Sequence, residues 1–409
     1  MSADLSDSPH AKLSSVLARV RPSATAAIAE AARRLAAEGR PVISLSTGEL
    51  DFDTPLHIQQ AAIEAMQQGQ TRYTSVSGTV ALKDAIIGKF ARDNQLQYRR
   101  DEVIASTGAK QIIFNALLAT LEPTDEVLFA APYWVSYPEM ALLAGATPVV
   151  ISPAPGDGFK ITPQTLAQAI TPNTRWLLLN SPGNPSGALY SAEELQALAE
   201  VLRQHPRILV MSDDIYEPIV FDGAFASFAQ AVPAMQSRTL TINGVSKSHA
   251  MTGWRLGYAG GPAWLIKGIE LLQSQSTTNP SSISQAGAVA ALNGPQDFIG
   301  EWCKRLRVRR DAAVAALNTA QPLLKVDSPP AAFYLYVDCA ETLGKRTPKG
   351  LLLETDIDLC RYLLEEAGVA VVPGSAFGLA PYFRLSYSVS DAELAAACEQ
   401  IVAACQALK

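Results

Sequence analysis

Short runs of apolar and β-branched residues recur along the chain from about residue 100. Each run ends in a polar or Gly/Pro-rich turn, and most of these turns lead into a stretch with helical periodicity. The runs cover residues 102–106, 126–130, 148–152, 175–180, 207–212, 239–243 and 255–261. The amphipathic stretches between them include residues 108–121, 134–144 and 191–204. Strands that alternate with helices predict an α/β fold whose mainly parallel, seven-stranded sheet is covered on both faces.

The connection before the seventh run is too short for this pattern. Only residues 244–254 separate the sixth run from the seventh, and they show no clear helix. A crossover between parallel strands usually needs a dozen or more residues. We therefore predict that the strand starting near Arg255 runs antiparallel to the others. Its beginning then lies at the sheet edge where the parallel strands end, which is the edge that binds ligands in open α/β sheets.

Both flanks of the chain predict a second, smaller α+β domain. Residues 1–60 and 300–409 are expected to form it, together with an N-terminal arm, and residues 61–299 to form the large domain. The flanks contain predicted helices and strands at 302–318, 356–367, 391–407, 333–338, 369–374 and 382–388. The first dozen residues are expected to be disordered or to form an arm onto a partner.

Composition narrows the class of protein. The 409 residues are 48% hydrophobic, which fits a large globular protein of two or three domains. A net charge of −6 argues against nucleic-acid binding, which needs a basic face. The five cysteines are scattered without a CxxC pair, so we expect reduced thiols and no metal site. Without a signal peptide or an apolar run of membrane length, the expectation is a soluble, cytoplasmic protein.

Two residues at the predicted strand ends carry the chemistry. Lys247 follows the sixth run, and a lysine buried there would have a lowered pKa and act as a Schiff-base nucleophile. Asp213 follows the fifth run, and a buried carboxylate is what keeps the ring nitrogen of pyridoxal phosphate protonated. Taken singly, Lys247 also fits a solvated lysine and Asp213 a helix-capping or turn residue.

Further candidates surround these two. Gly108, Ala109 and Lys110 open a helix directly after a strand, where backbone N–H groups bind anions such as phosphate. Ser246 and Arg255 would complete such a phosphate site, with Arg255 giving paired hydrogen bonds. A glycine turn before a helix is common, so this pattern is weak by itself.

Four more side chains fit a cofactor and its substrate. Tyr216 would bond a ring oxygen, and Trp134 would stack on the ring, although both also fit core packing. Asn184 would donate to the ring oxygen or to a substrate carboxylate, or else it is a loop residue. Arg384, inside an alternating apolar strand, needs a partner; a substrate carboxylate or a structural ion pair would serve.

The order and spacing of eight motifs resemble the fold-type-I, class I aminotransferases over nearly the whole chain, and especially the bacterial aspartate and aspartate/prephenate branch. The motifs are STGELDFDTP (46–55), YTSVSG (73–78), TGAKQ (107–111), PYWVSYPE (132–139), NSPGNPSG (180–187), SDDIYE (212–217), NGVSKSHAMTGWRLGY (243–258) and FRLSYS (383–388).

The resemblance implies a role for each matched residue. Lys247 would bind pyridoxal 5'-phosphate and shuttle the substrate proton, and Arg384 with Gly48 would hold the substrate α-carboxylate. The phosphate would be bound by Gly108, Ala109, Lys110, Ser246, Arg255 and, from the neighbouring subunit, Tyr73. Asp213, Tyr216, Asn184 and Trp134 would hold the ring. The resemblance thus implies a homodimer with active sites at its interface, and cis peptides before Pro132 and Pro185.

Two residues depart from the pattern. Ala109 stands where many relatives carry glycine, and His249 where close relatives often carry an aromatic residue, which would alter the site lining. No motif fixes the residue that binds a distal substrate carboxylate; Arg21 is the first candidate and His249 the second.

The expected reaction is transamination between an L-amino acid, aspartate or glutamate, and a 2-oxo acid. An aromatic or prephenate aminotransferase, or a lyase on the same fold, are the alternatives within this chemistry. A cofactor-sensing transcription regulator would need an added DNA-binding domain and a basic patch. A nicotinamide dehydrogenase would need a glycine fingerprint that the sequence lacks.

Overall fold

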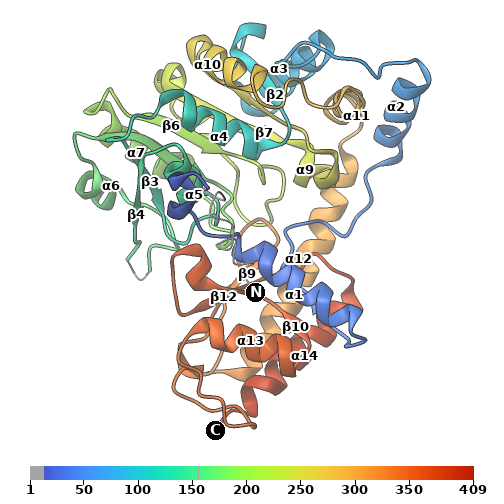
Figure 1. The fold of residues 1–409 in the computed structure, drawn as a ribbon, viewed down its shortest axis with the longest axis vertical. Helices are drawn as coiled ribbons and strands as arrows, with labels where there is room; N and C mark the ends of the chain where they lie inside the picture. Colours follow the sequence, from blue (N-terminus) through green and yellow to red (C-terminus); the bar gives the residue numbers. More distant parts are fainter. Residues whose placement is uncertain (1–12, 155) are drawn as a thin grey trace.

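A mixed seven-stranded sheet forms the upper part of the molecule (Figure 1). The computed structural model describes residues 13–154 and 156–409. The strand order is β2-β8-β7-β6-β5-β3-β4. The strands are, in that order, Val103–Ser106, Gly257–Gly260, Thr239–Gly244, Leu209–Asp213, Thr174–Asn180, Glu126–Ala130 and Thr147–Ile151. All seven predicted runs therefore form strands of one sheet.

The antiparallel strand is confirmed. β8 pairs antiparallel with both β7 and β2, whereas β3, β4, β5, β6 and β7 are parallel to their neighbours within that group. The chain returns from β7 to β8 through one turn of helix, α9 (Val245–Ser248), and a further short turn. Arg255 consequently lies at the same sheet edge as the carboxyl ends of the parallel strands.

Helices cover both faces of this sheet. Alternate residues of β5 point to opposite faces. Trp176 and Leu178 pack on one face with helices α4, α5 and α10. Leu177 and Leu179 pack on the other face with helices α6, α7 and α8. Both faces are buried, as expected for strands that are apolar throughout. The helices are α2 (Leu56–Gln67), α3 (Val80–Asn94), α4 (Ala109–Thr120), α5 (Tyr137–Leu143), α6 (Pro163–Ala169), α7 (Ala192–Arg203), α8 (Phe228–Ala231), α10 (Ala263–Ser274) and α11 (Ser282–Asn293).

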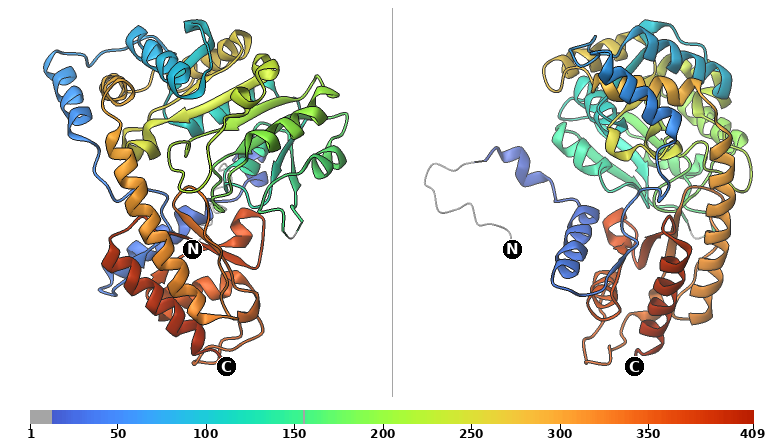
Figure 2. Two further views of the ribbon diagram at one scale, coloured as in Figure 1. Left: turned by 180° about the vertical axis from the view of Figure 1, so that it is seen from behind. Right: turned by 90° about the vertical axis from the view of Figure 1, so that its right-hand side faces the viewer.

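The lower part of the molecule is built from both ends of the chain. β1 pairs in parallel with β10, and β9, β11 and β12 form a separate three-stranded antiparallel sheet. The long helix α12 runs from the upper part down into this region (Figure 2). The elements are α1 (Ala24–Ala37), β1 (Ile43–Ser44), α12 (Asp297–Leu317), β9 (Tyr334–Asp338), α13 (Asp356–Glu366), β10 (Val369–Ala370), β11 (Val372–Pro373), β12 (Tyr382–Ser386) and α14 (Asp391–Gln406).

Two predicted elements differ from the structure. The strand expected over 369–374 is divided at Val371, because β10 pairs with β1 while β11 pairs with β12 of the other sheet. The helix expected from residue 134 begins at Tyr137, because residues 134–136 form a turn closed by the Tyr137 N–H and the Trp134 carbonyl. The expected N-terminal arm over residues 1–12 lies outside the described residues.

Helix starts follow the local sequence. Ser191 caps α7 and Ser390 caps α14, each in a reciprocal pair with a glutamate three residues later. This capping box satisfies backbone N–H groups that the first helical turn leaves unpaired.

Across residues 13–154 and 156–409, none of the helices has the length and apolar character that a membrane crossing requires.

Candidate active site

A cavity of about 710 Å³ lies where the parallel strands end, between them and β12. Most of the residues proposed from the sequence line this cavity, which brings together segments more than 300 positions apart. The proposed residues in its wall are Gly48, Ala109, Lys110, Trp134, Asn184, Asp213, Tyr216, Ser246, Lys247, Arg255 and Arg384.

Lys247 projects into this cavity from α9. Its Nζ donates a hydrogen bond to the Gly48 carbonyl at 2.5 Å and lies 6.0 Å from the centre of the Tyr216 ring. Burial and, to a smaller extent, the positive charges of Arg384 and Arg255 lower the pKa of Lys247 to about 8, against the opposing effect of Glu49. A lysine with this pKa is partly neutral near pH 7, as a nucleophile or a base must be.

Asp213 ends β6 beside Asn180 of β5. Its Oδ2 accepts a hydrogen bond from the Tyr137 hydroxyl at 2.6 Å, whereas its buried Oδ1 has no hydrogen-bond partner among the described residues. Burial raises the pKa of Asp213 to about 6. A buried carboxylate oxygen without a partner is costly, and a bound N–H⁺ group facing it would remove that cost.

The backbone at Gly108 and the side chain of Arg255 approach each other closely at the start of α4. Gly108 has φ 86°, and a Cβ at this position would lie 2.6 Å from Arg255 Nη2. The positive φ therefore favours glycine here, and a side chain at this position would displace the Arg255 guanidinium. The N-terminus of α4, Ser246 and the Arg255 guanidinium consequently face one space, and together they offer the donors that a phosphate needs.

Arg384 is buried in β12 with an exposed fraction of only 2%. Its Nη1 donates to Asn184 Oδ1 at 3.0 Å and its Nη2 to the Ser46 carbonyl at 2.5 Å. The guanidinium also lies 4.6 Å from the Tyr334 ring centre. Among the described residues no carboxylate pairs with Arg384 and its Nε has no hydrogen-bond partner, so its charge is available to an anion in the cavity. The alternative, a structural ion pair of Arg384, is not found within residues 13–154 and 156–409.

Three residues of the predicted set, Tyr73, Arg21 and Gly108, do not line the cavity. Tyr73 is 90% exposed and does not line the cavity. Arg21 lies outside the lining, where its backbone N–H donates to Glu139 Oε2 at 2.8 Å. Gly108 packs against Arg255, which lines the cavity. Lys110 also lines it, with its ammonium 4.8 Å from the Trp134 ring centre.

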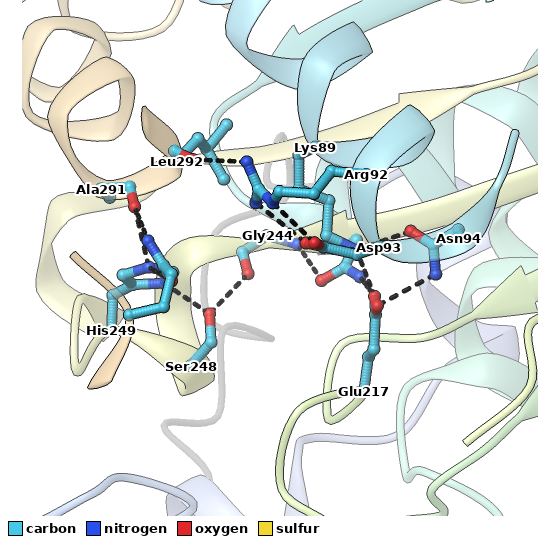
Figure 3. A network of polar contacts seen from close by, with 12 residues as sticks. Lys89, Arg92, Asp93, Asn94, Glu217, Gly244, Ser248, His249, Ala291 and Leu292 are labelled. Carbon is cyan, nitrogen blue, oxygen red and sulfur yellow. Dashed lines mark hydrogen bonds and ion pairs between the residues drawn. The ribbon is translucent and has the colours of Figure 1, made fainter. Parts of the chain in front are cut away.

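The expectation that His249 lines the site is wrong. His249 is 4% exposed and lies behind the cavity wall, where Nδ1 is 2.6 Å from Ser248 Oγ and Nε2 is 3.1 Å from the Ala291 carbonyl (Figure 3). Burial lowers its pKa to about 4, so the ring is neutral. A neutral, fully bonded ring at this position does not bind a substrate carboxylate.

Sequence reasoning missed three residues of the site. Tyr137 bonds Asp213, Tyr334 bonds the Tyr216 hydroxyl at 2.8 Å, and Asn180 Oδ1 accepts the Asn184 N–H at 2.8 Å. Tyr137 and Asn180 lie within motifs already recognised, so the spacing of the motifs could have revealed them. Tyr334 lies on a strand of the other sheet, and only tertiary structure places it there.

Comparison with known proteins decides the family. The family described as Aminotransferase class I and II matches residues 40–401. The chain belongs to this family. It is therefore an enzyme that depends on pyridoxal phosphate and transfers an amino group between an amino acid and a 2-oxo acid.

Relatives share almost the full length of the chain. An aspartate aminotransferase of Rhizobium meliloti (strain 1021) is 54% identical over 372 residues, which cover 91% of this chain and 90% of the relative. An aspartate/prephenate aminotransferase of Cereibacter sphaeroides is 51% identical over 397 residues, 97% of this chain and 99% of the relative.

Solved structures agree with this assignment. The crystal structure of the aspartate aminotransferase from Rhizobium meliloti matches with TM-score 0.94 and 52% identity, over 97% of this chain and 100% of that one. The aspartate aminotransferase of Thermus thermophilus with maleate matches with TM-score 0.90 and 38% identity, over 96% and 99%. The predicted fold-type-I architecture is thus confirmed, and the cis peptides expected before Pro132 and Pro185 are present.

Proposed function

We propose that this aminotransferase takes the amino group from L-aspartate or L-glutamate, with Lys247 as its catalytic residue. The observation that carries the proposal is the arrangement around the Lys247 amine. One cavity combines this amine, the unpaired Asp213 Oδ1 and the unpaired charge of Arg384.

The residues present fit pyridoxal phosphate. Asp213 Oδ1 would hold the protonated ring nitrogen, and the N-terminus of α4, Ser246 and Arg255 would hold the phosphate. Trp134, Tyr216 and Asn184 would contact the ring and its oxygen. When bound, the cofactor supplies an electron sink that makes the substrate Cα–H acidic.

Arg384 would orient the substrate. Its planar guanidinium suits a carboxylate, and the Asn184 side chain already aligned on Nη1 would share that contact. The cation is held in place by Tyr334 and Phe377, whose ring centres lie 4.6 and 5.0 Å away. With the α-carboxylate fixed there, the substrate Cα–H would face Lys247, whose Nζ takes the proton as general base. The Nζ of Lys247, now protonated, would then donate this proton in the second part of the amino transfer.

A cation in the cavity wall favours a substrate with a second carboxylate. Lys110 lines the cavity, and burial together with the charge of Arg255 lowers its pKa. An anion beside Lys110 would therefore stabilise its charged form. Arg21 is a second candidate, since Ser23 and Thr25 two and four residues on also line the cavity. The aromatic wall formed by Trp134, Tyr216 and Tyr334 supports prephenate or an aromatic amino acid as the alternative substrate.

Lys110→Ala and Arg21→Ala test this substrate assignment. Loss of a charge-assisted contact should raise KM for aspartate by about 10–100-fold, while KM for phenylalanine changes little. Arg33→Ala, an exposed position on the same N-terminal helix as the cavity-lining residues, is the matched control. Steady-state kinetics with both amino acids provide the comparison. Equal increases for aspartate and phenylalanine would contradict a role in binding the distal carboxylate.

We further propose that the protein is a cytoplasmic homodimer. Each chain would have two domains, one formed by residues 61–299 and the other by residues 1–60 and 300–409. Large apolar or aromatic side chains are exposed at Leu56 (76%), Tyr73 (90%) and Val80 (58%), within one stretch of the chain. Such exposure is typical of an interface, and it would let Tyr73 reach the phosphate in the neighbouring subunit. Light scattering should give twice the mass of one chain; a monomer at micromolar concentration would refute the dimer.

A further inference from the structure

A buried polar cluster lies outside the lining of the cavity, and Figure 3 shows three of its residues, Lys89, Asn94 and Glu217. We call Lys89, Asn94, Glu217 and Asn243 the Glu217 cluster. Lys89 forms an ion pair with Glu217 and donates to Asn94 Oδ1 at 2.7 Å. The side chains of Lys89 and Glu217 are only 8% and 9% exposed.

The Glu217 carboxylate is shared between two amides. Asn94 Nδ2, at the end of α3, donates to Oε1 at 2.9 Å, and Asn243 Nδ2, in β7, donates to Oε2 at 2.5 Å. Asn243 also uses its other end, since its Oδ1 accepts the N–H of Gly244 at 2.8 Å. The Asn243 side chain therefore joins the carboxylate directly to the backbone at the end of β7, three residues before Lys247.

The position of this contact along the chain links the two catalytic segments. Glu217 comes four residues after Asp213, and Asn243 four residues before Lys247. The β6–β7 register ends at the pair Asp213 and Ile242, and the Asp214 N–H bond to the Ile242 carbonyl is the next contact. Past that point β6 and β7 are no longer paired, although β7 stays paired with β8 through Gly244. The Glu217–Asn243 bond is a further contact that joins the segment after Asp213 to the end of β7 before Lys247.

The energetics favour a geometric role over a purely stabilising one. Burying a lysine and a carboxylate carries a desolvation penalty that their attraction barely offsets, so apolar side chains would hold the fold as well. Directional hydrogen bonds from two amides, however, fix the orientation of the carboxylate in a way that apolar packing does not.

We propose that Glu217 is a positioning residue for amino transfer: held by Lys89, its carboxylate fixes the Asn243–Gly244 end of β7 and so sets Lys247 relative to Asp213. The proposal rests on the function given above, in which Lys247 moves the substrate proton. A proton transfer depends steeply on the alignment of its base, whereas substrate affinity depends on Arg384 and the cofactor. Loss of the Asn243 bond should therefore lower kcat far more than it changes KM.

The chain offers a matched pair of variants. Asn243→Ala and Asn94→Ala each remove one amide from the same carboxylate, but only Asn243 belongs to the segment that carries Lys247. Both should lower the melting temperature of the apoenzyme to a similar extent. In the holoenzyme, Asn243→Ala should lower the single-turnover rate constant with aspartate by about 10–100-fold and shift the pH midpoint of the cofactor's visible band. Asn94→Ala should change neither strongly.

Each outcome decides the matter. Equal effects of the two variants on rate, band and melting temperature would mean that the cluster only stabilises the fold. If Asn243→Ala does not accumulate, Glu217→Gln serves as the second variant, because it keeps the side-chain volume. A single-turnover rate and a visible cofactor band unchanged from wild type in Glu217→Gln would overturn the proposal. A wild-type holoenzyme that reacts with another amino acid but not aspartate would refute the substrate assignment alone, and the same comparison then uses that amino acid.

Discussion

Lys247→Ala should lower kcat for transamination by about 10⁴-fold, because the variant loses the base that moves the substrate proton. It should still bind pyridoxal phosphate, since Arg255, Ser246 and Asp213 are unchanged. Borohydride treatment followed by peptide mass mapping should find the cofactor on residue 247 in the wild type and on no residue in the variant. Steady-state assays with aspartate and a 2-oxo acid measure the loss of rate.

An exposed lysine provides the control for this variant. Lys267 lies on α10, on the surface and away from the cavity, so Lys267→Ala should keep the wild-type kcat. A Lys247→Ala variant with near wild-type kcat, or a cofactor fixed to a different lysine, would contradict the assignment. The lowered pKa of Lys247 and its place in the cavity are the reasons to expect neither.

Asp213→Asn should lower kcat by about 10²–10³-fold, as removal of one preorganised electrostatic contact does in other enzymes. The neutral amide keeps the shape of the side chain but no longer favours a proton on the ring nitrogen of the cofactor. The affinity for pyridoxal phosphate should fall as well. Titration of the apoenzyme with the cofactor and single-turnover rates with aspartate would measure both effects.

The neighbouring residue makes this test selective. Asp214 is also buried, at 1% exposed, and burial likewise raises its pKa, to about 7, but it does not line the cavity. Its Oδ1 accepts a hydrogen bond from Ser212 Oγ at 2.6 Å. Asp214→Asn should therefore leave the rate and the cofactor affinity close to wild type. Similar losses in the two variants would show that burial alone, and not contact with the cofactor, accounts for the effect.

The sequence predicts the site well where the chemistry sits at the ends of buried strands. The run before Asp213 and the run before Lys247 are apolar throughout, so their polar ends stand out and the parallel arrangement places them at one edge. Arg255 could be placed there because eleven residues are too few for a parallel crossover.

The remaining parts depend on contacts between segments that no local pattern reveals. Val371 divides a run that looks like one strand, because its two halves pair with strands of different sheets. His249 stands two residues from Lys247, yet the turn of α9 directs it to Ala291 on the far side of the wall. Tyr334 reaches the cavity from the other sheet, and its partner Tyr216 is 118 positions away in the sequence.

The most direct test is a half-reaction of the holoenzyme with L-aspartate in the absence of any 2-oxo acid. The account predicts that the visible absorption band of the bound cofactor disappears as the amino group is transferred to it. One equivalent of oxaloacetate per active site should appear, and addition of 2-oxoglutarate should restore the band. A holoenzyme whose band is unchanged by aspartate, by glutamate and by aromatic amino acids would contradict the account.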